Sequence, residues 1–456
     1  MAKDKTTFEC TECGWTSPKW VGQCRQCHEW GTLEEAGRPS ALLPATATPS
    51  RQAQPIVQVD AHAADCRSTG VSELDRVLGG GIVPGAVVLL AGEPGVGKST
   101  LLLDVASRAA ELARRNGDGP VLYITGEESA SQVRNRAARI GALDDALLLA
   151  DEADVAVIAG HVQAQSPSLL IVDSVQTAYS RDEQGAAGGV TQVRAVTAAL
   201  IRLAKECNMP VLLVGHVTKD GGIAGPRILE HLVDVVCQFE GDRHNRLRLL
   251  RAVKNRYGPT DEVGCFELTD TGIRGLADPS GLFLSSNGLH VPGSCTTITL
   301  EGRRPMPLEV QALVAASAGG SPRRTTAGVD HSRVAMILAV LQARLGLDTS
   351  SEDVYVSTVG GAKASEPAVD LACALSIVSA YRGEPLRDNL VVFGEVGLTG
   401  EVRACVGVQR RLQEAARLGL THAVIPARGA DDVRPVDGIE IFPVSDLATG
   451  VRVGLP

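Results

Sequence analysis

The stretch GEPGVGKST, residues 92–100, constrains the fold of this chain more than any other feature. It follows the apolar run AVVLLAGE (86–93) and opens a helical pattern (98–117) that Gly117 should close. A G-x-x-x-x-G-K-[ST] loop between a strand and a helix wraps phosphate oxygens with backbone N–H groups, and the helix N-terminus adds donors and partial positive charge. The predicted nucleotide-binding residues are Gly92, Glu93, Pro94, Gly95, Val96, Gly97, Lys98, Ser99 and Thr100.

Three side chains are expected to hold the ATP and its metal. Lys98 should reach the β- and γ-phosphates, and the Ser99 hydroxyl should bind Mg²⁺. The apolar strand LLIVDS (169–174) delivers Asp173 to the sheet edge where the loop lies, so its carboxylate is placed to hold Mg²⁺ directly or through water. The alternative for Asp173 is a helix N-cap after a strand. The pattern thus predicts ATP and Mg²⁺ as cofactors.

Polar residues that follow two other strands are candidates for the chemistry of hydrolysis. YITGEES (123–129) places Glu127 and Glu128 after a strand, where one carboxylate could polarise the water that attacks the γ-phosphate. Glu127 is our first choice and Glu128 the reserve, and the other would be a solvated residue at a helix start. VLLVGH (211–216) ends in His216, which could sense the γ-phosphate or be an ordinary packed polar residue.

The chain has 456 residues, more than one ordinary core supports, so we expect several domains. Over 66–275, apolar strands alternate with helical stretches, which is typical of a mainly parallel sheet with helices on both faces. A separate α/β pattern covers 280–456. Residues 36–65 include a stretch rich in Pro, Ala, Ser and Thr and are expected to form a flexible linker between 1–35 and the first α/β domain.

Four of the 11 cysteines lie before residue 28, in the pattern CTEC…CRQC. Two C-x-x-C pairs with ten residues between them can meet as thiolates around one tetrahedral zinc ion. A segment this small has little core of its own, so Zn²⁺ should fold it. Disulfides or a redox pair are the alternatives, and such a ribbon could grip DNA or dock a protein. The predicted zinc ligands are Cys10, Cys13, Cys24 and Cys27.

Two absences bear on where the protein works. The N-terminus MAKDKTTFECTEC lacks the charged-then-apolar pattern of a signal peptide. The chain also lacks a run of about 18 or more uncharged apolar residues, so the sequence predicts no transmembrane helix. We therefore expect a cytoplasmic protein without a membrane partner, in which the scattered cysteines are reduced core residues.

A cluster of basic residues is unexpected in a chain of net charge −9. VKNRYGPT (253–260) contains Lys254 and Arg256 before a Gly-Pro turn, and DRHNRLRLLRA precedes it. The four arginines of that preceding stretch are expected on an ordinary exposed strand face. The net negative charge argues against nucleic-acid binding over the whole surface, but not against a local basic channel.

Three motifs in order carry a family resemblance: the four-cysteine ribbon, then GVSELDRVLGGGIVPGAVVLLAGEPGVGKST, then KNRYG. Together they resemble the RadA (Sms) family of bacterial DNA-repair proteins, whose central domain resembles the RecA ATPase core. The family signature is Lys-Asn-Arg-Phe-Gly, and here Tyr257 replaces the Phe, a mild aromatic exchange. The resemblance covers nearly the whole chain.

The resemblance implies roles for the cations. RecA-like cores work as rings or filaments with ATP at the boundary between subunits, where a cation from a neighbour can stabilise charge on the transferred phosphate. Lys254 and Arg256 could do this or grip DNA phosphates. In RecA-like proteins the loop that corresponds to residues 218–231 touches DNA at the centre of the ring. Lys219 and Arg227 of this loop are therefore DNA-binding candidates, and Arg181 of the Gly-rich loop 178–194 is a further one.

The region 280–456 resembles the protease domain of Lon, which uses a Ser nucleophile and a Lys base. The matching stretch SEPAVD (365–370) has Ala368 where the Ser would sit, and Gln409 stands at the Lys position. An alanine cannot attack and an amide cannot act as a base, so we expect no peptidase activity. A Lon-like domain behind a RecA-like core suggests a hexameric ring, with a filament as the alternative.

These patterns predict a DNA-dependent ATPase of recombinational repair that binds single-stranded and branched DNA, drives branch migration and works with a RecA-type recombinase. Aromatic residues are only 3% of the chain, so phosphate contacts should dominate over base stacking and binding should weaken steeply with salt. A signalling or clock-like ATPase that acts on proteins is the first alternative, and hydrolysis without DNA stimulation would favour it. An ATP-dependent protease is the second, which a casein digest would test.

Overall fold

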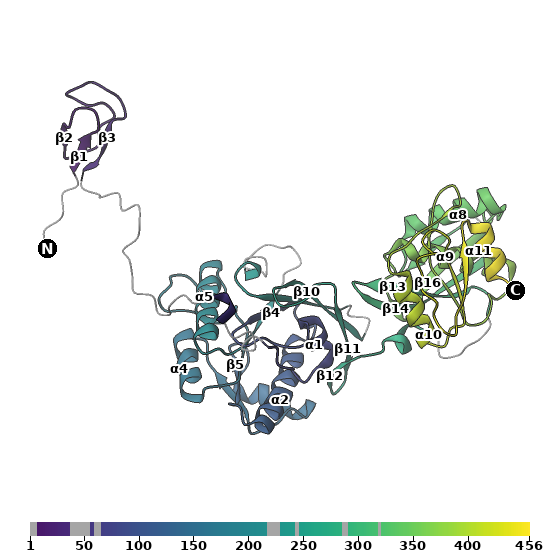
Figure 1. The fold of residues 1–456 in the computed structure, drawn as a ribbon, viewed down its shortest axis with the longest axis horizontal. Coiled ribbons are helices and arrows are strands. Elements are labelled where there is room, and N and C mark those ends of the chain that lie inside the picture. Colours follow the sequence, from purple (N-terminus) through teal and green to yellow (C-terminus); the bar gives the residue numbers. More distant parts are fainter. Residues whose placement is uncertain are drawn as a thin grey trace. The chain divides into compact units, whose positions relative to one another are not determined.

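The computed structural model describes residues 7–36, 55–58, 65–216, 229–241, 246–284, 291–317 and 321–456. Contacts divide the chain into two compact units, Met1–Ala61 and His62–Pro456, which are described separately below with the element labels of Figure 1. Within the described ranges, no helix combines the length and apolar character needed to cross a membrane.

The first unit contains a three-stranded antiparallel sheet with the order β2-β1-β3. Its strands are β1 (Thr7–Cys10), β2 (Thr16–Ser17) and β3 (Leu33–Ala36). Cys10 pairs with Leu33 in the ladder, and these residues form a small buried core with Cys24. So small a core buries little apolar surface, which makes the unit dependent on a further source of stability. One 3-10 turn, η1 (Ile56–Gln58), completes its described part.

The second unit contains a nine-stranded sheet with the order β12-β11-β10-β9-β4-β8-β7-β5-β6. The six strands from β9 to β6 in this order are parallel, and β10, β11 and β12 add an antiparallel edge. The bounds are β4 (Val87–Gly92), β5 (Val121–Thr125), β6 (Leu147–Asp151), β7 (Leu169–Asp173), β8 (Val211–His216), β9 (Val235–Gly241), β10 (Leu247–Asn255), β11 (Val263–Thr269) and β12 (Gly272–Gly275). The expected α/β class is confirmed.

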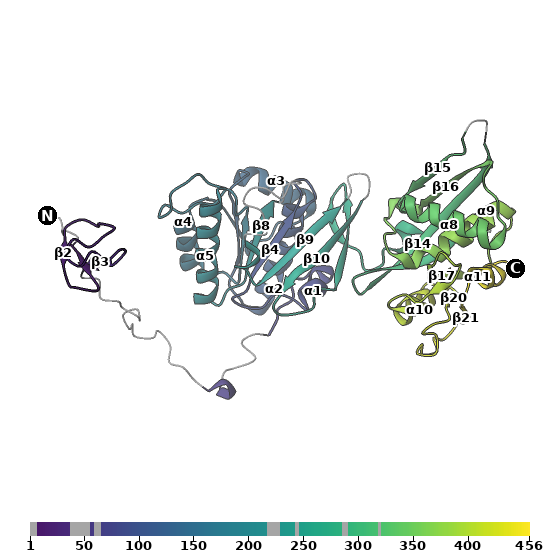
Figure 2. The same cartoon turned by 90° about the horizontal axis from the view of Figure 1, so that it is seen from above.

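Helices cover both faces of this sheet, because its central strands are apolar on both sides. One face packs against α1 (Ser72–Leu78), α2 (Lys98–Asn116) and α3 (Ala130–Ile140). The other packs against α4 (Val155–Gln165) and α5 (Val190–Glu206), which lie side by side in Figure 2.

Two helix starts in this unit position the residues discussed below. Gly97 caps the start of α2 with a φ of 110°, a left-handed backbone that favours glycine. At the far end Gly117 has a φ of 73° and donates its N–H to the carbonyl of Ala113, as the sequence predicts. At α3, Ser129 and Gln132 form a reciprocal capping box that fixes the turn after β5.

A seven-stranded mixed sheet with the order β15-β16-β14-β13-β17-β20-β21 forms the rest of this unit. Its strands are β13 (Ser294–Glu301), β14 (Arg304–Ala316), β15 (Arg324–Ala327), β16 (Glu352–Thr358), β17 (Leu390–Val392), β20 (His422–Pro426) and β21 (Glu440–Val444). A small ladder pairs β18 (Glu395–Val396) with β19 (Val402–Arg403). The helices are α7 (Ser280–Phe283), α8 (His331–Leu345), η3 (Val359–Gly361), η4 (Pro367–Val369), α9 (Asp370–Arg382), α10 (Val408–Arg417) and α11 (Leu447–Gly454).

A buried ion pair joins α1 to the first residue of β14. Glu73 and Arg304 are both almost completely buried and pair with each other. Arg304 also donates to the carbonyls of Val263 (3.1 Å) and Leu276 (2.9 Å), while Glu73 accepts from the backbone N–H of Cys265 (2.8 Å). Both charges are thus satisfied without water, the condition under which a buried pair is tolerated.

Candidate ATP site, basic motif and zinc site

The predicted phosphate loop connects β4 to α2 and packs tightly against β9. A Cβ atom on Gly92 would lie 2.5 Å from the carbonyl oxygen of Phe239, so only glycine fits there. On the other side, Arg248 of β10 donates from Nε to the carbonyl of Val96 at 3.2 Å and is buried. The expectation of an exposed strand face is wrong for Arg248, because β10 lies against the loop. No motif in the sequence reveals this contact.

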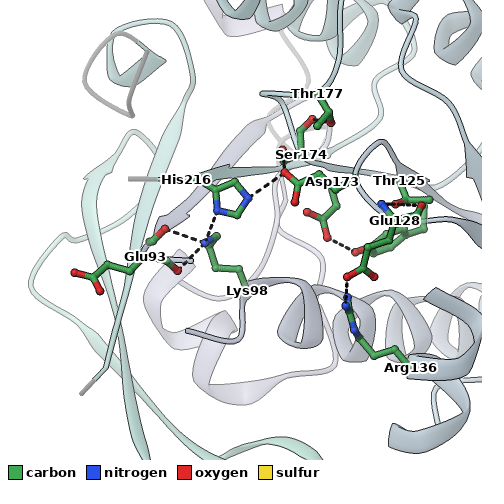
Figure 3. Close-up of polar contacts among 12 residues, drawn as sticks. Glu93, Lys98, Thr125, Glu128, Arg136, Asp173, Ser174, Thr177 and His216 are labelled. Atoms are coloured by element: carbon green, nitrogen blue, oxygen red, sulfur yellow. Dashed lines mark hydrogen bonds and ion pairs between the residues drawn. The ribbon is translucent and has the colours of Figure 1, made fainter. Parts of the chain in front are cut away.

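Lys98, the first residue of α2, points into the loop (Figure 3). Its Nζ donates to the carbonyl oxygens of Gly92 (2.8 Å) and Glu93 (3.0 Å) and lies 3.1 Å from Nδ1 of His216. Burial lowers the pKa of Lys98 to about 8, and the neighbouring carboxylates of Asp173 and Glu127 only partly oppose this effect.

The strands β8, β7 and β5 follow β4 in the sheet order. Their carboxyl ends therefore lie beside Lys98, which follows β4. β8 ends in His216 and β7 in Asp173, and Glu127 follows β5. Glu127 accepts a hydrogen bond from the Ser174 hydroxyl, and its Oε1 lies 3.1 Å from Nε2 of His216. His216 therefore bridges Lys98 and Glu127. Figure 3 shows its contact with Lys98.

Glu128 turns away from this group. Its carboxylate pairs with Arg136 of α3, and its backbone carbonyl accepts from the Thr125 hydroxyl at 2.8 Å (Figure 3). The capped start of α3 separates the two neighbouring glutamates, one toward His216 and one toward the helix. This geometry favours Glu127 as the carboxylate that could act on water.

Asp173 offers the ligands expected of a magnesium site. The Tyr123 hydroxyl donates to its Oδ2 at 2.7 Å, whereas its Oδ1 is buried and has no hydrogen-bond partner among the described residues. A carboxylate oxygen with spare acceptor capacity and the hydroxyl of Ser99 are hard oxygen ligands of the kind that Mg²⁺ prefers. Burial raises the pKa of Tyr123 well above its usual value, so its hydroxyl remains a donor.

The phosphate loop and the motif KNRYG lie at opposite ends of the strands of this sheet. Gly92 stands opposite Phe239 in the β4–β9 ladder, at the loop end, whereas Asn255 stands opposite Val235 at the other end. From Arg248 to Asn255, β10 covers seven residue steps. At about 3.3 Å per step, this is a separation of roughly 20 Å.

The motif's side chains divide into two groups. Lys254 donates to the carbonyls of Glu230 (2.6 Å) and Val233 (2.8 Å), and Arg256 pairs with the buried Asp234 at 3.0 Å. Burial lowers the pKa of Lys254, with Arg256 adding to the effect. Asn255 instead donates to the carbonyl of Leu78 in α1 at 3.2 Å, and a Cβ on Gly258 would lie 3.2 Å from the Cα of Gly79. Asn255 and Gly258 therefore fasten the motif to α1.

The four predicted zinc ligands come together in the first unit. Their Sγ atoms all lie within 4.8 Å of one another, with 3.7 Å between Cys10 and Cys27 and 3.6 Å between Cys13 and Cys24. A hydrogen bond with the Thr32 hydroxyl lowers the pKa of Cys10 to about 6, which favours a thiolate ligand. Four thiolates in such a cluster form the donor set of a structural zinc site.

Comparisons with known proteins agree with this layout. Three family models match: an AAA domain over residues 51–222, a rubredoxin metal binding domain over 8–35, and Subunit ChlI of Mg-chelatase over 326–429. The DNA repair protein RadA of Mycobacterium tuberculosis (strain H37Rv) is 52% identical over 440 residues, which is 95% of this chain and 90% of the relative. RadA of Bacillus subtilis (strain 168) is 43% identical over 462 residues, or 100% of both chains. The chain belongs to the RadA family of DNA repair proteins.

In this RadA-family chain the AAA domain is an ATPase domain, so its cofactors are ATP and Mg²⁺. The match to a metal binding domain and the cysteine cluster make the ribbon a Zn²⁺ site. The fold class is likewise confirmed as a zinc ribbon, a phosphate-loop core and a C-terminal α/β domain.

The remaining residues singled out in the sequence are the candidates for DNA binding and the two positions that correspond to the Lon dyad. Arg181 pairs with the buried Asp154 at 2.6 Å, although the Arg181 side chain remains 74% exposed. Lys219 and Arg227 lie outside the described residues. In the C-terminal domain Ala368 is buried, and Gln409 exchanges hydrogen bonds with the backbone of Arg434 at 2.8 and 3.3 Å. Neither Ala368 nor Gln409 supplies a nucleophile or a base, and the lack of peptidase activity stays a prediction.

Proposed function

We propose that the chain is a DNA-dependent ATPase of recombinational repair. In this proposal it binds single-stranded and branched DNA, drives branch migration as a hexameric ring, and works with a RecA-type recombinase in the cytoplasm. The names of its RadA relatives and its ATPase domain support a role in DNA repair. The observation that carries the proposal further is the position of KNRYG relative to the phosphate loop.

Lys254 and Arg256 stand roughly 20 Å from their own phosphate loop, by the strand arithmetic of β10. A side chain cannot cross this distance, so neither cation reaches the ATP bound by its own subunit. In a ring with ATP at each boundary, the same cations of a neighbouring subunit would face that ATP. We therefore assign Lys254 and Arg256 to the neighbour's ATP site, where a cation supplied in trans stabilises charge on the transferred phosphate.

Each residue beside the phosphate loop then has its own role in hydrolysis. Glu127 accepts a proton from the attacking water, and His216 connects Glu127 to Lys98 at the phosphates. Ser99 and Asp173 hold the metal, and Mg²⁺ when bound neutralises charge on the phosphate oxygens. Glu128 stays with Arg136 and orients the start of α3.

The contacts of the two cations suggest how DNA could regulate hydrolysis. Lys254 must leave two backbone carbonyls, and Arg256 must leave Asp234, before either can meet a phosphate. Both contacts hold the two side chains against their own subunit, so an extended position would require these contacts to break. DNA bound in the ring would accelerate hydrolysis if it favoured the extended position.

The first experiment measures ATP hydrolysis with and without single-stranded DNA, for the wild type and for Lys254→Ala. We expect DNA to stimulate the wild type and the variant to lose that response. Hydrolysis that ignores DNA in the wild type would contradict the proposal and point to an ATPase that acts on proteins.

A mixing experiment tests action in trans. Glu127→Gln and Lys254→Ala are each expected to lack DNA-stimulated hydrolysis alone, but a mixed ring contains boundaries with an intact Glu127 on one side and an intact Lys254 on the other. Such mixtures should regain part of the DNA-stimulated rate. The matched control mixes Glu127→Gln with the double variant Glu127→Gln/Lys254→Ala, which leaves no intact Glu127. An inactive first mixture would mean that Lys254 serves its own subunit or has another role.

A further inference from the structure

Tyr123 is a buried tyrosine of β5 that neither the family motifs nor the hydrolysis scheme above uses. Its side chain is only 1% exposed, and its hydroxyl donates to Oδ2 of Asp173 at 2.7 Å. No other hydrogen bond of this hydroxyl occurs among the described residues. Among the described residues, the Tyr123 hydroxyl therefore hydrogen-bonds to a single carboxylate oxygen.

The strand register explains this contact. β5 pairs with β7 so that Thr125 stands opposite Asp173 and Tyr123 opposite Ile171. Tyr123 and Asp173 consequently point to the same face, one diagonal step apart, a distance that a long aromatic side chain can span. The ring packs in the core between the sheet and α2, which holds the hydroxyl in place.

The two oxygens of Asp173 have different surroundings. Oδ2 is occupied by the Tyr123 hydroxyl, and Oδ1 is buried with no partner among the described residues. A carboxylate fixed through one oxygen cannot rotate freely about its last torsion, so the other oxygen keeps one direction. Partners behind a metal ligand commonly orient it in this way and increase its affinity for the metal.

We propose that Tyr123 is a positioning residue for Mg²⁺, which fixes Asp173 so that Oδ1 faces the metal or its water shell. This inference rests on the role of Asp173 proposed above. Tyr123 does not touch nucleotide or metal in this scheme and acts only through the carboxylate. Its effect should therefore appear in the metal-dependent part of nucleotide binding and nowhere else.

The test measures binding of a fluorescent ATP analogue to the full-length protein, once with Mg²⁺ and once with EDTA. The ratio of the two affinities is the gain due to the metal. Tyr123→Phe keeps the ring and removes only the hydroxyl, so we expect the gain to fall about tenfold, a typical loss for a partner behind a metal ligand. The affinity in EDTA should stay unchanged, which also shows that the variant is folded.

Two further variants interpret the result. Tyr355→Phe removes a comparable tyrosine-to-aspartate contact, 3.4 Å from Asp353, in the other sheet and should leave the gain unaltered. Asp173→Asn should abolish the gain, and if it does not, the proposed metal role of Asp173 fails before Tyr123 is considered. With Asp173 confirmed, a Tyr123→Phe variant that keeps the full gain, or loses affinity equally in Mg²⁺ and EDTA, would overturn the inference.

Discussion

The Lys98 side chain at the phosphate loop is placed where burial opposes its charge. Lys98 is buried with its ammonium on two backbone carbonyls, and this lowers its pKa to about 8. Phosphate oxygens of a nucleotide favour the charged form of Lys98 and so must raise that pKa. Binding of nucleotide and binding of a proton are therefore linked at this residue.

We predict proton uptake on nucleotide binding at pH 8.5. In the free protein more than half of Lys98 is neutral at this pH, because its pKa is about 8. The nucleotide restores the ammonium, so the affinity should fall as the pH rises above about 8. Calorimetry in buffers with different ionisation enthalpies measures the uptake. Lys98→Arg remains charged throughout and is the control, and equal uptake by that variant would assign the proton to another group.

Prediction of single residues is strongest where spacing in the sequence carries the chemistry. The phosphate loop and the four cysteines are local patterns, so their residues could be named before their geometry was known. Tyr123 could not, because its partner Asp173 is 50 positions away and nothing in VLYIT marks the contact. Glu127 and Glu128 are adjacent in sequence, and only the cap of α3 and the position of Arg136 separate their directions.

At the scale of elements, the short helix α1 connects two distant parts of its unit. Its C-terminal carbonyls accept from Asn255 of the KNRYG motif, and near its other end Glu73 pairs with Arg304 of β14. The helix stands between the basic motif and the C-terminal sheet.

The buried pair gives a prediction about stability. Arg304→Met leaves the buried Glu73 carboxylate with only Arg76, whose Nε is 3.6 Å away and whose side chain is 46% exposed, so the change should cost up to about 3–5 kcal/mol of unfolding free energy. Urea denaturation measures the loss. The double variant Glu73→Met/Arg304→Met should recover most of it, because no charge remains buried. Arg303→Met is the matched control, since its pair with Asp261 is about half exposed and should contribute at most about 1 kcal/mol. Equal losses at positions 303 and 304 would show that burial is not the cause.

The order of strands is what sequence reasoning could not supply. Alternating strands and helices indicated a mainly parallel sheet, and this part is correct for β4 to β9. β10 runs antiparallel to β9, so Arg248 near its start lies at the phosphate loop and Lys254 near its end lies at the opposite ends of the strands. Local patterns contain no information on that pairing, because it depends on contacts between separate strands.

At the scale of the whole molecule, the chain consists of two compact units. All three tryptophans, Trp15, Trp20 and Trp30, belong to the first unit. Trp20 and Trp30 are 60% and 73% exposed, while Trp15 packs against the small core around the cysteines. Intrinsic tryptophan emission therefore reports on the zinc ribbon alone.

We predict that a zinc chelator unfolds the ribbon and leaves the ATPase unit intact. The tryptophan emission should shift to longer wavelength as Trp15 enters water, because the metal supplies most of the folding energy of so small a core. Hydrolysis of ATP without DNA should remain within about twofold of the untreated rate, since the ATP site lies wholly in the other unit. Cys13→Ser should reproduce the shift. A parallel loss of basal hydrolysis would mean that the two units depend on each other.

The opposite placement of the phosphate loop and KNRYG on one sheet has a consequence for genetics. In the ring proposed above, with Lys254 acting in trans, a subunit that lost Lys254 would keep its own nucleotide pocket and damage the site of its neighbour instead. In a cell that makes both versions, altered chains would enter shared rings and silence intact ones, so that the allele would behave as dominant negative. An allele that prevents folding altogether would leave the intact chains to assemble among themselves and would be recessive.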